Sequence, residues 1–150
     1  MLERERKFLV KSEHRSWLEN NCVKEFIQQG YIFSNYRMNC RVRIINNTTA
    51  FLCIKFDVSP TDKNEFEYQI DVESAYELYE HSTYRLEKTR YTLSNNIIMD
   101  VYPDGDAVIE IEFTVDLTLI PYYCGEEVTG NPKYSNVHKA MYSGLNGKRI

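Results

Sequence analysis

Polar and apolar residues alternate along the N-terminal segment 2–10, and this period of two predicts a β-strand. Glu3 and Glu5 fall on one face of that strand, whereas Phe8 falls on the other. The turn dipeptide at 46–47, two asparagines that tolerate positive φ, predicts a hairpin. The same kind of alternation predicts further strands at 31–32, 40–45, 49–56, 65–70, 88–91, 97–102 and 107–113.

Three other segments have the spacing of helices. Ser12 is a suitable N-cap, and apolar residues then recur at helical spacing as far as Phe26, before the pair at 29–30 breaks the pattern. We therefore expect a first helix that extends past Phe26. A stripe of apolar residues without proline or glycine predicts a second helix over 73–85, and a third, short helix is expected over 135–141.

Composition places the chain among ordinary globular proteins. It has 150 residues, of which 43% are hydrophobic and 27% charged, and these values predict one domain over residues 1–150. The 12 tyrosines and 7 phenylalanines favour a β-rich fold. No apolar stretch is long enough to span a membrane, and the N-terminus lacks the apolar core of a signal peptide, so we expect a cytoplasmic protein with reduced cysteines that has no membrane partner. The net charge of −4 argues against a nucleic acid polymer as partner.

Charged residues of one sign recur two positions apart on several predicted strands. The simplest explanation is a half-buried sheet whose charged face meets water. A solvated face, however, usually mixes the two signs, and neighbouring like charges repel unless something neutralises them. If the sheet closes with its apolar side outward, carboxylates inside can hold divalent cations and basic groups can hold phosphate. The same-sign pairs are Glu3/Glu5, Arg41/Arg43, Glu65/Glu67, Lys88/Arg90 and Glu110/Glu112.

The N-terminal pattern Glu3-x-Glu5-x-Lys7 resembles the E-x-E-x-K signature of the CYTH superfamily, the triphosphate tunnel metalloenzymes. Further resemblances follow in order along nearly the whole chain. The resemblance implies an α+β, mainly β fold: an eight-stranded antiparallel closed β-barrel that forms a tunnel, with helices packed outside. The supporting segments are 29–32, 41–43, Lys55, 63–67, 88–91, 98–100, 109–113, 127–129 and 134–136.

The resemblance also implies two sites for Mg²⁺ or Mn²⁺ inside the tunnel. One cation would hold the triphosphate, and the second would activate the attacking water. The expected ligands of the first are Glu3, Glu5 and Glu112. The candidates for the second site or its surroundings are Glu65, Glu67, Asp100 and Glu110, and the division between the two sites stays open.

Basic residues would face the phosphates of the substrate, and their alternative role is ion pairing between strands. In short relatives that cleave tripolyphosphate, a tyrosine and a lysine are linked to the choice of reaction, and Tyr31 and Lys88 match them; Tyr31 could instead be a core aromatic residue. The chain departs from the family at Phe56, where glycine is common, and at Lys63 and Lys133, where arginine is common. The expected phosphate-binding residues are Lys7, Arg41, Arg43, Lys55 and Arg90.

The sequence thus favours a metal-dependent phosphohydrolase that cleaves a terminal phosphoanhydride of inorganic tripolyphosphate or of an organic triphosphate. Three alternatives stay open: an adenylate cyclase, a thiamine triphosphatase and a binding module for polyphosphate or nucleotides. Only two residues precede Glu3, so the His-Phe extension typical of the cyclase branch is absent, and the short chain leaves little room for recognition of a thiamine ring. The partner expected is a triphosphate-containing small molecule, and a homodimer is compatible with the pattern. His14, His81, His138 and the pair Glu126-Glu127 are not expected to bind metal.

Overall fold

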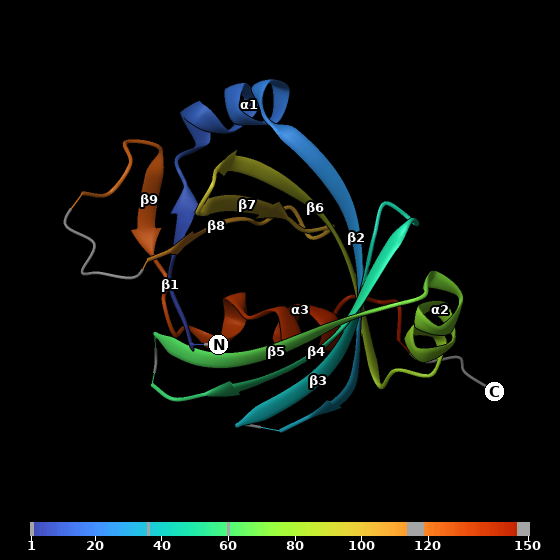
Figure 1. Ribbon diagram of the computed structural model, residues 1–150. Helices are drawn as coiled ribbons and strands as arrows, with labels where there is room; N and C mark the ends of the chain where they lie inside the picture. Colours follow the sequence, from blue (N-terminus) through green and yellow to red (C-terminus); the bar gives the residue numbers. More distant parts are fainter. Residues whose placement is uncertain (1, 36, 60, 114–118, 147–150) are drawn as a thin grey trace.

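The computed structural model describes residues 2–35, 37–59, 61–113 and 119–146. Strands dominate it, and three α-helices are attached to them (Figure 1). The strands are β1 (Leu2–Val10), β2 (Val23–Ser34), β3 (Met38–Ile45), β4 (Thr49–Asp57), β5 (Asp62–Ile70), β6 (Tyr84–Ser94), β7 (Ile97–Val101), β8 (Ala107–Glu112) and β9 (Cys124–Glu127). The helices are α1 (Ser12–Asn21), α2 (Val72–Glu80) and α3 (Asn136–Met141), with a 3-10 turn, η1 (Pro132–Tyr134), before the last.

Eight of the described strands close into an antiparallel barrel. Hydrogen-bonded neighbours run in the order β5, β4, β3, β2, β6, β7, β8 and β1, and β1 returns to pair with β5. β1 closes the ring because its start, residues 2–4, pairs with β5, while residues 5–9 pair with β8 on its other side. β9 pairs with β1 at residues 8 and 10, beyond the end of β5. The predicted eight-stranded closed barrel is confirmed.

The apolar side of the barrel faces outward, where two helices cover part of it. Leu18 of α1 is 3% exposed and packs in a cluster with Phe8 and Met99, on the outer face of β1 and β7. Ala75 of α2 is fully buried and packs in another cluster with Val42 of β3. Figure 1 shows α1 and α2 outside the ring of strands. Covering the outer face with helices buries apolar surface and leaves the inner face to polar side chains.

α3 lies at one end of the barrel. Ala140 is fully buried against Tyr31, Leu86 and Val108, whose side chains share the inner face of the strands with the charged residues. Figure 1 shows α3 inside the outline of the ring. Ser135 is the N-cap of this helix, because its hydroxyl accepts a hydrogen bond from the backbone N–H of His138 at 3.2 Å. The C-terminal segment therefore covers one end of the barrel interior.

The predicted first helix is too long. α1 ends at Asn21, and Val23 and Phe26 belong to β2, which starts immediately afterwards. Residues 23–31 pair with β6 and residues 27–34 with β3, so backbone pairing on both sides outweighs an apolar spacing that also fits a helix. Ser12 is the first helical residue, not the N-cap.

The second helix is shorter than predicted as well, since α2 ends at Glu80 and β6 begins at Tyr84. Gly30 of β2 shows how closely α2 and the turn after it approach the barrel: a Cβ at this position would lie 2.9 Å from Ser82 Cβ and 3.3 Å from Tyr79 Cα. Only glycine fits this contact without movement of the turn. Within the described ranges, none of the helices is both long and apolar enough to cross a membrane.

A charged barrel interior as candidate active site

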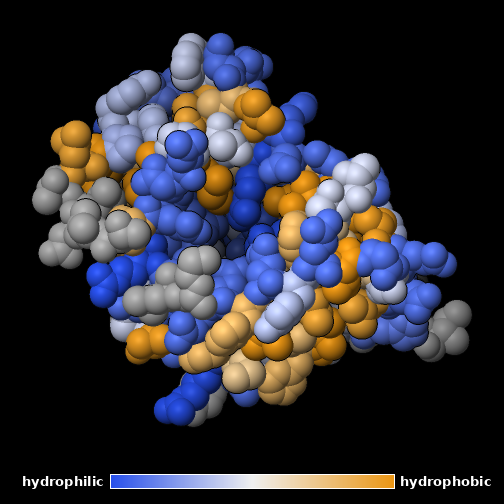
Figure 2. Space-filling view, viewed as in Figure 1, coloured by the Kyte–Doolittle hydropathy of each residue, from blue (hydrophilic) through white to orange (hydrophobic). Residues whose placement is uncertain are grey.

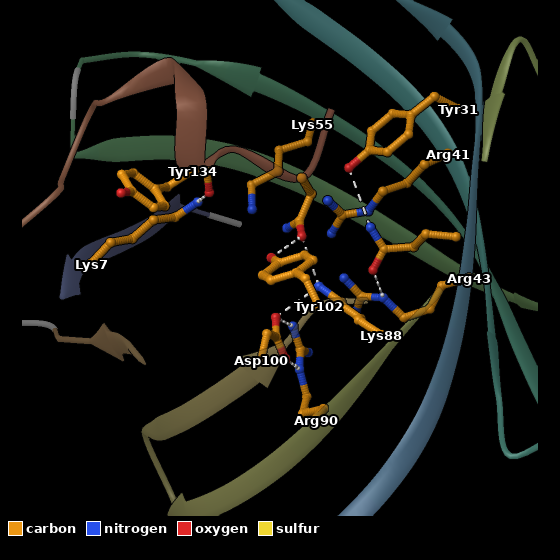
Figure 3. A network of polar contacts seen from close by, with 12 residues as sticks. Lys7, Tyr31, Arg41, Arg43, Lys55, Lys88, Arg90, Asp100, Tyr102 and Tyr134 are labelled. Carbon is orange, nitrogen blue, oxygen red and sulfur yellow. Dashed lines mark hydrogen bonds and ion pairs between the residues drawn. The ribbon is translucent and has the colours of Figure 1, made fainter. Parts of the chain in front are cut away.

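The charged pairs predicted from the sequence share the inner face of the barrel. The strand register places Glu5 opposite Glu112, Lys7 opposite Glu110, Arg90 opposite Asp100 and Lys55 opposite Glu65, so these side chains lie on one face of the sheet. Figure 2 shows a hollow lined by hydrophilic side chains in the view along the barrel. In Figure 3 the labelled side chains from several strands converge on this interior. Glu67 and Glu112 are the most exposed of the predicted site residues.

Asp100 is the centre of one network. Its side chain is fully buried and accepts hydrogen bonds from Lys88 Nζ at 2.8 Å and from Arg90 Nε and a terminal Arg90 nitrogen at 2.8 and 2.9 Å. Burial opposes ionisation of this carboxyl, but Arg90 and Lys88 hold its pKa below its usual value. Both oxygens of Asp100 are thus engaged by cations, and this arrangement fixes the orientation of Lys88 and Arg90 (Figure 3).

Lys88 is enclosed from all sides. Its Nζ also donates to Asn136 Oδ1 at 2.9 Å, and Tyr102 donates its hydroxyl proton to the same oxygen at 2.5 Å. Burial, with help from Arg90, lowers the pKa of Lys88 to about 7, against the attraction of Asp100. Lys88 is therefore poised to gain or lose a proton near neutral pH. The sequence reading did not assign roles to Tyr102 and Asn136, although Asn136 lies in the last of the segments that resemble the family.

Two pairs of carboxylates face each other across the strands. Burial and a hydrogen bond to Glu65 raise the pKa of Glu3 to about 8, although Lys55 Nζ lies 3.3 Å from Glu3 Oε2. Burial opposes ionisation of Glu5, but Lys55 and Lys7, together with a hydrogen bond to Glu110, lower its pKa to about 2. Carboxylates within hydrogen-bonding reach of each other repel unless they share a proton or a cation.

The donor set of this interior fits a hard divalent cation. Glu110 is 9% exposed, and its buried Oε2 has no hydrogen-bond partner within the described residues. A buried carboxylate oxygen without a donor is costly, and a cation held between Glu110 and Glu5 would remove that cost. Mg²⁺ and Mn²⁺ prefer such oxygen ligands. The structure thus brings Glu5 and Glu110 together, and Glu3 and Glu65 form a neighbouring pair.

A thiol adjoins the second group of carboxylates. Cys53, Glu65 and Glu67 each present one potential ligand atom, and these atoms lie within 4.8 Å of one another. Cys53 Sγ donates to Glu67 Oε2 at 3.5 Å. Cys53 was expected only to be a reduced, partly buried thiol, because its place opposite Glu67 depends on the register between β4 and β5, which the sequence does not reveal.

Basic residues lie among these carboxylates on the inner face. Arg41 lies 3.6 Å from a Glu65 oxygen, and Lys7 Nζ donates to the Tyr134 carbonyl at 3.4 Å. Burial and the proximity of Arg41 and Arg90 lower the pKa of Arg43. Cations held this close together form a site for an anion of high charge density.

The departures from the family pattern do not remove charge from the interior. Phe56 lies on the outer face, where its ring stacks on Phe66 with centroids 6.3 Å apart. Lys63 pairs with Asp57 at 3.6 Å, and Lys133 Nζ lies 5.4 Å from the Tyr134 ring centroid. The imidazole rings of the three histidines contact groups outside the charged interior: Glu13 and Tyr122 for His14, the Glu77 carbonyl for His81 and Tyr142 for His138. Glu127 forms an ion pair with Arg6 at 2.7 Å.

A closed barrel of eight antiparallel strands with an interior lined by ionisable residues of both signs is the architecture of a triphosphate tunnel. The comparisons with known proteins agree with this class. The chain is 30% identical, over 144 residues and 89% of its length, to an inorganic triphosphatase of Acetivibrio thermocellus, of which it covers 90%. The chain belongs to the CYTH superfamily of triphosphate tunnel metalloenzymes. No family model matches the sequence.

Solved structures show the same fold. The hypothetical protein NE1496 superposes with a TM-score of 0.62 at 28% identity, over 93% of this chain and 97% of that one. The PH1012 protein of Pyrococcus horikoshii OT3 gives a TM-score of 0.58 at 24% identity, over 77% of this chain and 80% of that one. A candidate adenylyl cyclase from Hippeastrum, described as having a dominant triphosphatase activity, gives 0.50 at 16% identity, over 76% and 80%.

Proposed function

We propose that this chain is a metal-dependent triphosphatase that hydrolyses a terminal phosphoanhydride, with inorganic tripolyphosphate as the leading substrate and an organic triphosphate as the other. The observation that carries the proposal is that pairs of carboxylates and several basic side chains together line the barrel interior. This arrangement suits a polyanion bound together with divalent cations. The name of the relative from Acetivibrio thermocellus supports the choice of an inorganic substrate.

The carboxylates would hold Mg²⁺ or Mn²⁺. Glu3, Glu5 and Glu112 are the proposed ligands of the cation that holds the substrate, and the neighbouring carboxylates Glu65, Glu67, Glu110 and Asp100 belong to the second site or its surroundings. A bound divalent cation supplies charge neutralisation at the phosphoryl oxygens and acidifies the attacking water. Because Glu5 keeps a low pKa, it stays ionised over the whole neutral range and is available as a ligand.

The basic residues of the interior would bind and orient the phosphate chain. Arg41, Arg43 and Arg90 are fixed guanidinium groups that can bind phosphate oxygens in pairs, and Lys7 and Lys55 add compact positive charge. Asp100 keeps Arg90 and Lys88 in place before substrate arrives. Preorganised charge of this kind stabilises the transition state because little reorganisation is needed during the reaction.

Lys88 and Tyr31 are proposed as the catalytic pair. Both are almost fully buried on the inner face, close to the end of the barrel that α3 covers. A lysine with a pKa near 7 is partly protonated at neutral pH and can donate a proton to a leaving phosphate oxygen. The adenylate cyclase and thiamine triphosphatase activities, and a binding module without turnover, are the competing functions.

A substrate panel distinguishes these functions. Purified protein is supplied with tripolyphosphate, ATP or thiamine triphosphate, each with Mg²⁺ or Mn²⁺ and with chelator, and both orthophosphate and cyclic AMP are measured. The proposal predicts metal-dependent orthophosphate release that is fastest from tripolyphosphate. Cyclic AMP from ATP would assign the chain to the cyclase branch instead, and retention of tripolyphosphate without any product would indicate a binding module.

A further inference from the structure

Gln29 is a fully buried amide on the inner face of β2 that the proposed chemistry does not yet use. Its Oε1 accepts a hydrogen bond from Arg43 Nε at 3.2 Å, and its Nε2 donates to the Tyr31 hydroxyl oxygen at 3.2 Å. In Figure 3, dashed lines from Tyr31 and from Arg43 meet at this one amide between them. Gln29 therefore connects a proposed catalytic residue with a proposed phosphate-binding residue.

The direction of both hydrogen bonds follows from the chemistry of the partners. A guanidinium group has only donors, so the amide of Gln29 must present its oxygen to Arg43. The amide nitrogen then faces Tyr31, and the Tyr31 oxygen must act as acceptor. Arg41 lies opposite Tyr31 in the strand register, and its guanidinium group, whose pKa the nearby Tyr31 helps to raise, can only donate. The Gln29 donor thus reaches the Tyr31 oxygen, with the Arg41 donors nearby, and the hydroxyl proton of Tyr31 must point elsewhere.

The rest of Tyr31 cannot move. The side chain is 1% exposed and packs in the cluster that includes Leu86 and Val108. With the ring fixed by packing, rotation about the C–O bond is the freedom that remains to the hydroxyl group, and the donor from Gln29 restricts that rotation. The hydroxyl proton is therefore directed away from Gln29, and an acceptor in the barrel interior could receive it.

We propose that Gln29 is a positioning residue that makes the Tyr31 hydroxyl a hydrogen-bond donor to a phosphate oxygen of the bound triphosphate. The inference rests on the proposed function, because it assumes a triphosphate inside the barrel. Arg43 fixes the orientation of the Gln29 amide, and the amide N–H group makes the Tyr31 oxygen an acceptor toward Gln29, so that its proton is available to another group. A neutral amide at this position therefore controls a hydrogen bond that it does not itself make to the substrate.

Gln29→Glu reverses that polarity with almost no change of shape. The carboxylate still accepts from Arg43, but its second oxygen faces Tyr31 and accepts the hydroxyl proton, which is then withdrawn from the substrate. The new negative charge also weakens anion binding, so the variant has to be compared in a double-mutant cycle with Tyr31→Phe. In the Tyr31→Phe background only the charge effect remains, and the difference between the two backgrounds isolates the hydroxyl group.

The cycle is measured as kcat/KM for tripolyphosphate. Tyr31→Phe is expected to lower kcat/KM about tenfold, the effect of one charge-assisted hydrogen bond. Gln29→Glu should lower kcat/KM about ten times more in the wild-type background than in the Tyr31→Phe background, because only the wild-type background has this hydrogen bond to lose. Gln29→Leu adds no charge. Its effect on kcat/KM should be about threefold larger in the wild-type background than in the Tyr31→Phe background, because the Tyr31 hydroxyl becomes free to rotate but is not drawn toward residue 29. This variant also keeps the test available if the carboxylate variant does not fold.

Gln28→Glu is the matched control, because Gln28 lies on the opposite face of β2, where it contacts Glu87 and Tyr76. It should leave kcat/KM within about twofold, because this half-buried side chain lies outside the barrel interior and, in the described part of the chain, contacts none of the proposed site residues. Additive effects of Gln29 and Tyr31 in active, folded variants would overturn the proposal, since a residue that acts through the Tyr31 hydroxyl must lose that effect when the hydroxyl is absent. If the wild-type protein releases no orthophosphate, the proposed function fails. The same cycle is then measured as the Kd for tripolyphosphate by calorimetry, where coupling supports the role of Gln29 and additivity refutes it.

Discussion

Replacement of Asp100 by asparagine tests whether one buried carboxylate holds the basic side of the interior together. Asp100 is fully buried and accepts three hydrogen bonds, at 2.8, 2.8 and 2.9 Å, from Lys88 and Arg90. An asparagine of the same shape has a single acceptor oxygen, and its amide N–H group must face one of the two cations. Loss of one partner in a buried ion pair costs about 3–5 kcal/mol, and the remaining acceptor places the expected loss for Asp100→Asn near the lower end, about 3 kcal/mol.

The loss should depend on pH in a defined direction. Burial already lowers the pKa of Lys88 from 10.5 to about 7, and removal of Asp100, whose charge favours protonated Lys88, lowers that pKa further. Between the folded and unfolded pKa values the unfolded chain binds more protons than the folded one, so stability rises with pH. The deficit of Asp100→Asn relative to wild type is therefore expected to be larger at pH 6 than at pH 9.

Urea unfolding at these two pH values, in the presence of chelator, measures the effect. A loss of about 3 kcal/mol corresponds to a decrease in Tm of roughly 6–12 °C for a chain of this size. Asp57→Asn is the matched control, because Asp57 pairs with Lys63 at 3.6 Å and its side chain is 55% exposed, so its substitution should cost under about 1 kcal/mol. A loss for Asp100→Asn no larger than that of the control would refute the reasoning.

Two further substitutions test separate parts of the account. Lys88→Ala should lower turnover of tripolyphosphate more than it lowers affinity for other triphosphates, which steady-state kinetics and calorimetry together would show; a uniform loss over all substrates would indicate general phosphate binding instead. Gly30→Ala should destabilise the fold by about 1–3 kcal/mol in urea unfolding, because the added Cβ would lie 2.9 Å from Ser82 Cβ, and unchanged stability would mean that the turn after α2 can yield.

Much of the fold is readable from the sequence, because the period of two is strict where one face is apolar and the other charged. On β1 the alternation of Glu3 and Glu5 with Phe8 places the carboxylates inside and the phenylalanine against the helices. The same pattern identifies the other charged strands. The period of two does not identify the start of β2, because Val23 and Phe26 also fit helical spacing. These residues form a strand because β2 pairs with β3 and β6 on its two sides.

The partners within the interior could not be predicted, because they depend on strand register. Gln29 meets Arg43 since β2 and β3 pair with these two residues opposite each other, and nothing in the local sequence fixes that alignment. Cys53 likewise reaches Glu67 through the register of β4 with β5. The sequence thus predicts on which face the charged residues lie, whereas the pairs they form, and the polar residues Gln29, Cys53 and Tyr102 among them, require the closed barrel.

The central claim is that the carboxylates inside the barrel hold the cation on which hydrolysis depends. The most direct test is orthophosphate release from tripolyphosphate as a function of Mg²⁺ or Mn²⁺ concentration, for wild type, Glu5→Gln and Glu127→Gln. Glu5 is buried inside, whereas Glu127 pairs with Arg6 at 2.7 Å, and both changes remove one negative charge. The account predicts that Glu5→Gln lowers metal-dependent turnover by orders of magnitude and that Glu127→Gln does not. Near-normal activity of Glu5→Gln, or full activity of the wild type in chelator, would contradict it.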